Sequence, residues 1–297
     1  MNRFLPKGLG WRPDVPDFRD FSPSHDTIRD HLERLREGQH ALEEQANVDL
    51  REFFARDAPD QAGFNASSAF ACAAIVEYFE YRAHGRFIEP SALFLSQAAP
   101  RLRAGGCPSC CGLRATLKAM VRLGMPSEDQ WPGIASVADL APTDPVLFSF
   151  SEFYRSIGYF RLDQPGASGS DTLQDVKSFL RAGFPIAFGF AVPGSLTYDA
   201  DIAYRPTFDS IRGGQAAVAL GYDDNRMTAA KGALLIRCSW GTKWGERGYG
   251  WLPYAFVEKR LALDFWTLVK PDWLASGEFV RPANLACQTA AGWQCGN

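Results

Sequence analysis

The stretch SWGTKWGERGYG occupies residues 239–250 and is rich in tryptophan and glycine. Short apolar runs border this stretch on both sides. The run GALLIRC ends directly before Ser239, and the run YGWLPYAFV begins at Tyr249, within the last two residues of the stretch. Apolar runs of this length that are punctuated by Gly and Asp are typical of strands. The stretch therefore lies in a strand-rich part of the chain.

Two more apolar runs, PIAFGFAV and QAAVALGYDD, precede this stretch and predict further strands. Earlier segments have helical character instead. Residues 66–82 are small and apolar on nearly all sides, as in a buried helix, and residues 111–124 and 172–183 each predict a helix that ends at a glycine. Helices first and strands later predict an α+β protein whose lobes differ in type.

The N-terminal part contains two segments. Residues 1–23 are rich in Pro, Asp and aromatic residues without a period, so we expect an extended arm on the surface. Residues 25–46 predict a thinly amphipathic helix, whose apolar residues at roughly helical spacing are Ile28, Leu32, Leu35 and Leu42. This helix is either solvated with one narrow contact stripe or a docking surface for a partner.

The whole chain then divides into three parts. They are an N-terminal arm with its helix (1–47), a two-lobe domain (48–271) with a helical lobe to about residue 160 and a strand-rich lobe from about residue 161, and a C-terminal tail (272–297). The tail is polar and rich in small residues, so we expect it to wrap the surface.

Composition narrows the class of protein. The chain has 297 residues, of which 46% are hydrophobic and 22% charged, as in an ordinary soluble globular protein. A formal net charge of −3 gives no electrostatic reason for binding nucleic acid or an acidic membrane. No window approaches the roughly 18 apolar residues of a membrane span, and the basic N-terminus lacks the apolar core of a secretory signal. We therefore expect a cytoplasmic protein.

A second informative stretch, DQAGFNASSAF, spans residues 60–70. It combines a glutamine, a loop of small residues and the first turn of an apolar helix, which is the usual form of a catalytic turn. Such a turn usually presents a cysteine, but here it presents Ser67.

With both halves in view, the chain resembles the papain-like cysteine peptidases, of the bacterial kind without a long pro-segment. The resemblance extends to about residue 271 and is most specific at residues 239–250. The other segments that carry it are GWRPDVPDFRDF, VDLREF, DQAGFNASSAFA, GLRATLKAMVRLGMPSEDQWP, YFRLDQ, VKSFLRAGFPIAFGF, GGQAAVALGYDD and LLIRC. It implies a papain-like fold, with a helical lobe and a β-barrel-like lobe on either side of a cleft.

The family's chemistry needs a thiolate nucleophile, an imidazole, an amide that orients the imidazole, and a glutamine that helps bind the oxyanion. On this sequence the glutamine is Gln61. The nucleophile position six residues later is Ser67, the histidine position is Gln215 and the asparagine position is Cys238. The resemblance therefore implies a non-peptidase homologue, in which Trp240 and Trp244 keep the family's packing roles around the cleft.

No other cysteine fits the nucleophile position. A glutamine six residues earlier is missing for Cys72, Cys110 and Cys111. Cys72 also lies more than one turn inside the buried helix, where a thiol acts as a small hydrophobe.

A base for Ser67 is missing as well. The four histidines, all in the N-terminal third, are His25, His31, His40 and His84. A serine hydroxyl needs a base to react, and Gln215 has no titratable proton. We expect Ser67 to be a helix-start residue, Cys238 a buried thiol, and Gln215 a hydrogen-bond partner of Ser67 or Cys238.

The remaining cysteines have three interpretations. The C-x₂-C spacing of Cys107 and Cys110 resembles half of a zinc site, which Cys287 and Cys295 of the tail would complete. A disulfide and free thiols are the alternatives. The family disulfide cannot form, because Phe64 stands at one of its positions, and the family's substrate-gripping Gly-Gly is here Gly112-Leu113. We expect no cofactor.

The sequence thus predicts a catalytically inactive protein that binds a peptide or a partner protein through the cleft or the 25–46 helix. Two alternatives stay open. One is a repurposed hydrolase or acyltransferase that uses Ser67 or Cys238 together with Gln61, and the other is a structural subunit whose cleft is plugged by its own arm or tail.

Overall fold

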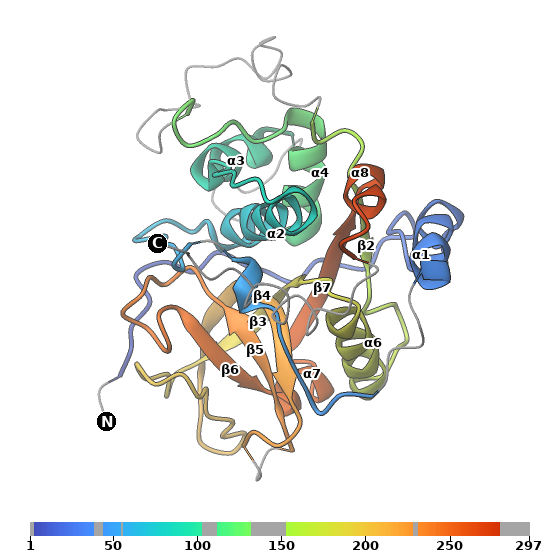
Figure 1. Cartoon of the computed structure of the whole chain (residues 1–297). Coiled ribbons are helices and arrows are strands. Elements are labelled where there is room, and N and C mark those ends of the chain that lie inside the picture. The colour runs from blue at the N-terminus through green and yellow to red at the C-terminus, as the bar shows by residue number, and fades with distance from the viewer. Residues whose placement is uncertain are drawn as a thin grey trace, which may run out of the picture.

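The computed structural model describes residues 3–38, 44–54, 56–102, 112–131, 153–227 and 231–279 (Figure 1). Its helices are α1 (Asp26–Gly38), α2 (Ser67–His84), α3 (Ala92–Ala98), α4 (Leu113–Leu123), α6 (Gly169–Arg181), α7 (Tyr254–Glu258) and α8 (Pro271–Ala275), with short 3₁₀ turns η1 (Arg51–Phe53) and η2 (Ala99–Leu102).

The three helices predicted after residue 60 occur close to their expected bounds, whereas the helix predicted over residues 25–46 is shorter: α1 ends at Gly38, and residues 44–46 are not helical. Helix α2 is buried on nearly every side and ends at Gly85, whose φ of 60° suits a residue without a side chain. Helix α4 ends at Gly124, and α6 begins with a capping box in which Ser168 and Asp171 exchange hydrogen bonds. Local signals therefore decide where these helices begin and end.

The strands are β1 (Asn47–Asp49), β2 (Gly158–Arg161), β3 (Ile186–Pro193), β4 (Ile211–Asp223), β5 (Ala233–Arg237), β6 (Tyr249–Pro253) and β7 (Ala262–Val269). They pair antiparallel in the order β2-β7-β3-β4-β5-β6, and β1 adds to β4. The sheet is apolar on both faces because helices cover both: α2 contacts β4 from one side and α6 from the other.

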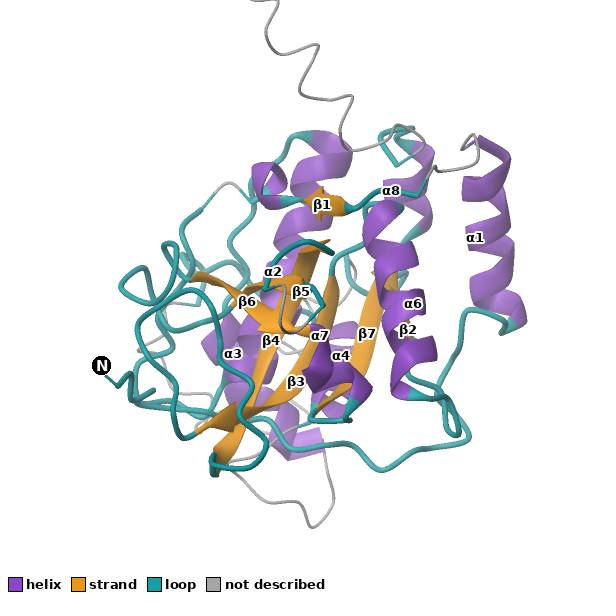
Figure 2. Cartoon of the chain, turned by 90° about the horizontal axis from the view of Figure 1, so that it is seen from below, coloured by secondary structure: helices purple, strands orange, loops and turns teal. Residues whose placement is uncertain are grey.

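Three layers result from this arrangement: helices, the sheet, and helices again. Helices α2, α3 and α4 gather above the sheet in Figure 1, and in the view from below α6 lies in front of the strands with α2 behind them (Figure 2). Helices packed on both faces of an antiparallel sheet agree with the predicted α+β class, which is confirmed.

The N-terminal arm, residues 3–25, passes between the helices and the sheet before it reaches α1 (Figure 1). Phe4 and Trp11 of the arm are buried. The arm is therefore packed into the molecule more deeply than the surface segment that its composition predicts.

Helix α1 buries only a narrow stripe. Ile28 and Leu32 are buried, whereas Asp26, Arg29 and Asp30 are exposed. This pattern agrees with the solvated-helix interpretation, and the docking of a partner on α1 stays a prediction.

Candidate functional site

The site predicted from the sequence lies where the start of α2 meets the sheet. Gln61 belongs to the loop before α2, Ser67 is the first residue of α2, and Gln215 lies on β4. The backbone fixes the loop against the turn after β5: Gln61 N donates to Ser239 O at 2.9 Å, and Gly241 N donates to Pro59 O at 2.9 Å. Segments far apart in sequence thus meet at one point.

A set of hydrogen bonds between neutral side chains fills this point. Gln215 Nε2 donates to Gln61 Oε1 at 3.0 Å and to Ser239 Oγ at 3.2 Å, and Ser239 Oγ donates to Gln61 Oε1 at 2.5 Å. All three side chains are buried. Gln215 Oε1 finds no partner among the described residues.

Ser239 is the member of this set that sequence reasoning missed. The sequence predicts Ser67 or Cys238 as the hydrogen-bond partner of Gln215, but Gln215 Nε2 donates to Gln61 and Ser239 instead. The position of Ser239 directly after Cys238 was the available signal. Because side chains alternate along an extended chain, the residue after Cys238 is as well placed to reach the site as Cys238 itself.

Ser67 connects the helix to the sheet. Its Oγ accepts a hydrogen bond from Ala216 N at 3.1 Å, and the side chain is fully buried. It is the first helical residue, as expected, while Ala66 takes the cap position without a side-chain cap bond. The hydrogen bond recorded for the hydroxyl involves a backbone amide, which is not a base.

Cys238 is a buried thiol. Burial raises its pKa well above the ordinary value, and burial does the same to the pKa of Cys72. Both cysteines are free. A thiol with a raised pKa stays protonated at neutral pH and is a poor nucleophile.

The described histidines lie elsewhere. His25 stacks on Phe21 with ring centroids 4.2 Å apart, and His31 lies on α1. His84 is the last residue of α2, roughly 25 Å along the helix axis from Ser67 at 1.5 Å per residue. His40 lies outside the described residues.

The two tryptophans pack beside the site. Their rings meet edge to face, with centroids 4.7 Å apart, and Phe4 of the N-terminal arm packs on both. Trp244 Nε1 donates to Thr197 O at 3.2 Å, and Trp240 is 5% exposed. Both indoles belong to the hydrophobic core.

The N-terminal arm occupies the space beside Gln61. Gln61 Nε2 donates to Leu9 O at 2.9 Å and to Phe64 O at 2.7 Å, so both of its amide hydrogens are engaged. Gly10 N and Trp11 N both donate to Gly214 O, the residue before Gln215. The backbone of the chain's own arm therefore binds Gln61, the glutamine to which the resemblance assigns oxyanion binding.

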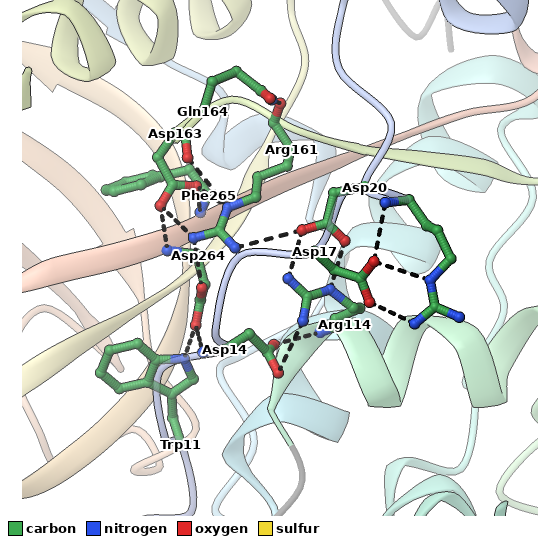
Figure 3. A network of polar contacts seen from close by, with 11 residues as sticks. Trp11, Asp14, Asp17, Asp20, Arg114, Arg161, Asp163, Gln164, Asp264 and Phe265 are labelled. Atoms are coloured by element: carbon green, nitrogen blue, oxygen red, sulfur yellow. Dashed lines mark hydrogen bonds and ion pairs between the residues drawn. The ribbon is translucent and has the colours of Figure 1, made fainter. Parts of the chain in front are cut away.

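A buried network of charges continues from this point (Figure 3). Arg161 Nη2 lies 2.8 Å from Asp163 and 2.9 Å from Asp264, and Nη1 lies 3.7 Å from Asp20 of the arm. Asp163 also accepts the backbone N–H groups of Asp264 and Phe265, both at 2.9 Å. Carboxylates held this way need their cation, because burial makes an unpaired charge costly.

Asp264 joins the network to the N-terminal arm. Its Oδ2 accepts from Trp11 Nε1 at 3.1 Å and from Asp14 N at 2.8 Å, and its φ of 60° is unusual for a residue with a side chain. Burial raises the pKa of Asp264 to about 7, reinforced by the negative charges of Asp14 and Asp163 and opposed by the Asp14 N–H and by Arg161.

This pKa makes stability depend on pH. The folded state binds the Asp264 proton more tightly than the unfolded chain, so the resulting stability is full below about pH 4 and is lost as the pH rises through 7. Between pH 4 and pH 7, we expect the titration of Asp264 to lower the free energy of unfolding by up to about 1.4 kcal/mol per pH unit. Urea unfolding at pH 5 and pH 8 measures the fall. Asp264→Asn should show a smaller one, and equal falls would contradict the assignment.

The remaining predicted cysteine site cannot be placed. Cys107, Cys110, Cys111, Cys287 and Cys295 all lie outside the described residues. Within the described part of the chain, no group of three His, Cys, Asp or Glu side chains is arranged to hold a metal ion.

The start of a buried helix packs against an antiparallel sheet, and the candidate site lies at their junction. Residues 154–256 match the family model of the papain family cysteine proteases. Over 219 residues the chain is 27% identical to an uncharacterised peptidase C1-like protein of Acanthamoeba polyphaga mimivirus. The alignment covers 70% of this chain and 68% of that protein.

Solved structures agree with this fold. Xylellain, a cysteine protease from Xylella fastidiosa, superposes with a TM-score of 0.68 at 27% identity, over 91% of this chain and 98% of xylellain. A procathepsin B from Trypanosoma congolense superposes with a TM-score of 0.62 at 16% identity, over 89% and 86% of the two chains, and shares the fold alone. The predicted papain-like α+β fold is confirmed.

The described residues include no helix that is long and apolar enough to cross a membrane.

Proposed function

We propose that this protein is a catalytically inactive papain-like protein that serves as a binding or scaffold protein for a peptide or a partner protein. The observation that supports inactivity is the hydrogen bonding of the two substituted positions. Ser67 accepts from a backbone amide, and Gln215 donates to Gln61 and Ser239. None of these hydrogen-bond partners is a base that could take the proton of Ser67.

The chemical consequence is large. A serine hydroxyl becomes a nucleophile only when a base removes its proton, and an amide such as Gln215 cannot do so. Loss of a nucleophile–base unit lowers the rate by on the order of 10⁶. Cys238 is no substitute, because burial raises its pKa.

The binding role is supported by the N-terminal arm. Leu9, Gly10 and Trp11 make backbone hydrogen bonds to Gln61, Asn65 and Gly214 on both sides of the site. The surface between the helices and the sheet therefore has the chemistry to hold an extended chain.

A labelling experiment tests inactivity. The intact protein is treated with a thiol alkylator and with a fluorophosphonate, and the modified residues are located by mass spectrometry. We expect Ser67 to stay unlabelled and Cys238 to react as slowly as buried Cys72, with both cysteines labelled rapidly after denaturation. Rapid stoichiometric labelling of Ser67 or Cys238 in the native protein would instead establish the hydrolase or acyltransferase alternative.

A structural subunit is the second candidate, because the chain's own arm fills the site as that role requires. Light scattering of the purified protein and of native lysate separates the two: a scaffold for peptides is stable alone, whereas a subunit is found in one large assembly.

A further inference from the structure

The segment GWRPDVPDFRDF supplies none of the residues at the substituted catalytic positions, yet it makes specific contacts with both lobes. Three of its side chains carry these contacts: Trp11, Asp14 and Asp20. Each one inserts into a position that the surrounding residues are shaped to receive.

The position of Trp11 is an indole slot. Its floor consists of glycines: a Cβ at Gly189 would lie 1.9 Å from the Trp11 ring, and one at Gly214 would lie 2.4 Å from the Trp11 carbonyl oxygen. At its end, Asp264 accepts the indole N–H. The slot thus combines close apolar contact with one hydrogen-bond acceptor, which favours tryptophan over phenylalanine, because a phenyl ring has no N–H to donate.

The position of Asp14 is the start of α4. Its Oδ2 accepts Arg114 N at 2.9 Å, as a carboxylate does at the N-terminus of a helix, and a Cβ at Gly112 would lie 2.4 Å from its Oδ1. The site is therefore formed for an aspartate by α4 and by Asp264, which binds the Asp14 N–H.

The carboxylate of Asp20 lies beside two guanidinium groups. Arg114 donates to both oxygens of Asp20 at 2.5 Å, and Arg161 lies 3.7 Å away (Figure 3). A bidentate arginine on one lobe and a second arginine on the other select a carboxylate at this point.

The residues between these anchors point away. Val15 is 80% exposed and Phe18 is fully exposed, while Pro13 and Pro16 restrict the backbone. Contacts confined to a few anchors, with a stiffened spacer, are the pattern of a peptide ligand on a recognition site.

We propose that the surface under the N-terminal arm is a peptide-binding site for the pattern Trp-x₂-Asp-x₅-Asp. The arm of the same chain occupies this site in the structure. A partner protein with a segment of the same pattern binds there by displacing the arm. This inference rests on the proposed binding function and names its ligand. Vacating the site leaves Arg114 and Asp264 without the partners they have here, so an occupant must supply the same groups.

The test uses the full chain and a fluorescent peptide of residues 5–24, followed by fluorescence anisotropy. The variant Trp11→Ala weakens the competing arm, so we expect the peptide to bind this variant at least tenfold more tightly than the wild type. Should Trp11→Ala fail to fold, Asp20→Asn weakens the arm in its place.

Matched peptides show which side chains carry the binding. A peptide with Trp11→Ala, or with both Asp14→Asn and Asp20→Asn, should bind at least tenfold more weakly. A peptide with Phe18→Ala should bind unchanged, because that ring is fully exposed.

Equal affinity for wild type and variant, or equal affinity of all peptides, would overturn the inference. Such a failure is distinct from failure of the proposed inactivity, which is read from the labelling of Ser67 and Cys238.

Discussion

Replacing Arg161 with methionine should lower the free energy of unfolding by about 3–5 kcal/mol, the usual loss when one partner of a buried ion pair is removed. The guanidinium is 5% exposed and lies within 3 Å of Asp163 and Asp264. Methionine fills a similar volume but leaves the Asp163 carboxylate without its cation and Asp264, which is about half protonated at pH 7, without the guanidinium beside it. Urea unfolding at pH 7 measures the loss.

The control is a solvent-exposed Arg–Asp pair on the surface of the same protein. Arg19 pairs with Asp17 at 2.6 Å, but its side chain is 84% exposed. Arg19→Met should change the free energy of unfolding by less than about 1 kcal/mol, because exposed pairs contribute little. A loss for Arg161→Met as small as the control's would show that the buried network does not hold the lobes.

The variant Trp244→Ala should also destabilise the protein by about 3–5 kcal/mol, the range for removing a buried aromatic residue. Trp244 is fully buried, packs on Trp240 and Phe4, and donates to Thr197 O. The truncation removes those contacts and leaves a cavity. The free energy of unfolding is again obtained from urea titration.

An exposed aromatic residue serves as its control. Phe208 is 92% exposed, so Phe208→Ala should change the free energy of unfolding by no more than about 0.5 kcal/mol. A loss below about 1 kcal/mol for Trp244→Ala would contradict the assignment of this indole to the core.

The sequence predicts those parts of the fold whose signals are local. Helix α4 ends at the glycine that the pattern indicates, and the run GALLIRC becomes β5. The run YGWLPYAFV was predicted as one strand, but only its first half is β6; its second half is helix α7, which begins directly after Pro253. Strands β1, β2 and β7 were missed. For β1 the reason is its length, because three residues are too short for an alternation of apolar and polar side chains to be visible.

The candidate site was predictable in part. The glutamine, the serine and the strand glutamine meet near the start of α2 as the resemblance implies, but Ser239 was missed and Cys238 has no recorded side-chain bond to Gln215 among the described residues. Which of two adjacent residues faces a site depends on strand twist and register, which the sequence does not state.

The charge network could not be predicted at all. Asp14 and Asp20 stand in a segment rich in Pro and Asp, and such segments are usually solvated. Their burial depends on Arg161 and Asp264, which lie far along the chain, so no window of sequence contains both partners.

The hydrogen bond from Trp11 to Asp264 also constrains how the molecule is made. It joins residues 253 positions apart, so the ribosome releases the indole long before its acceptor exists. Contacts with such separation form slowly, because a long loop must close first. A segment that is synthesised long before its partner is therefore among the last to reach its native place.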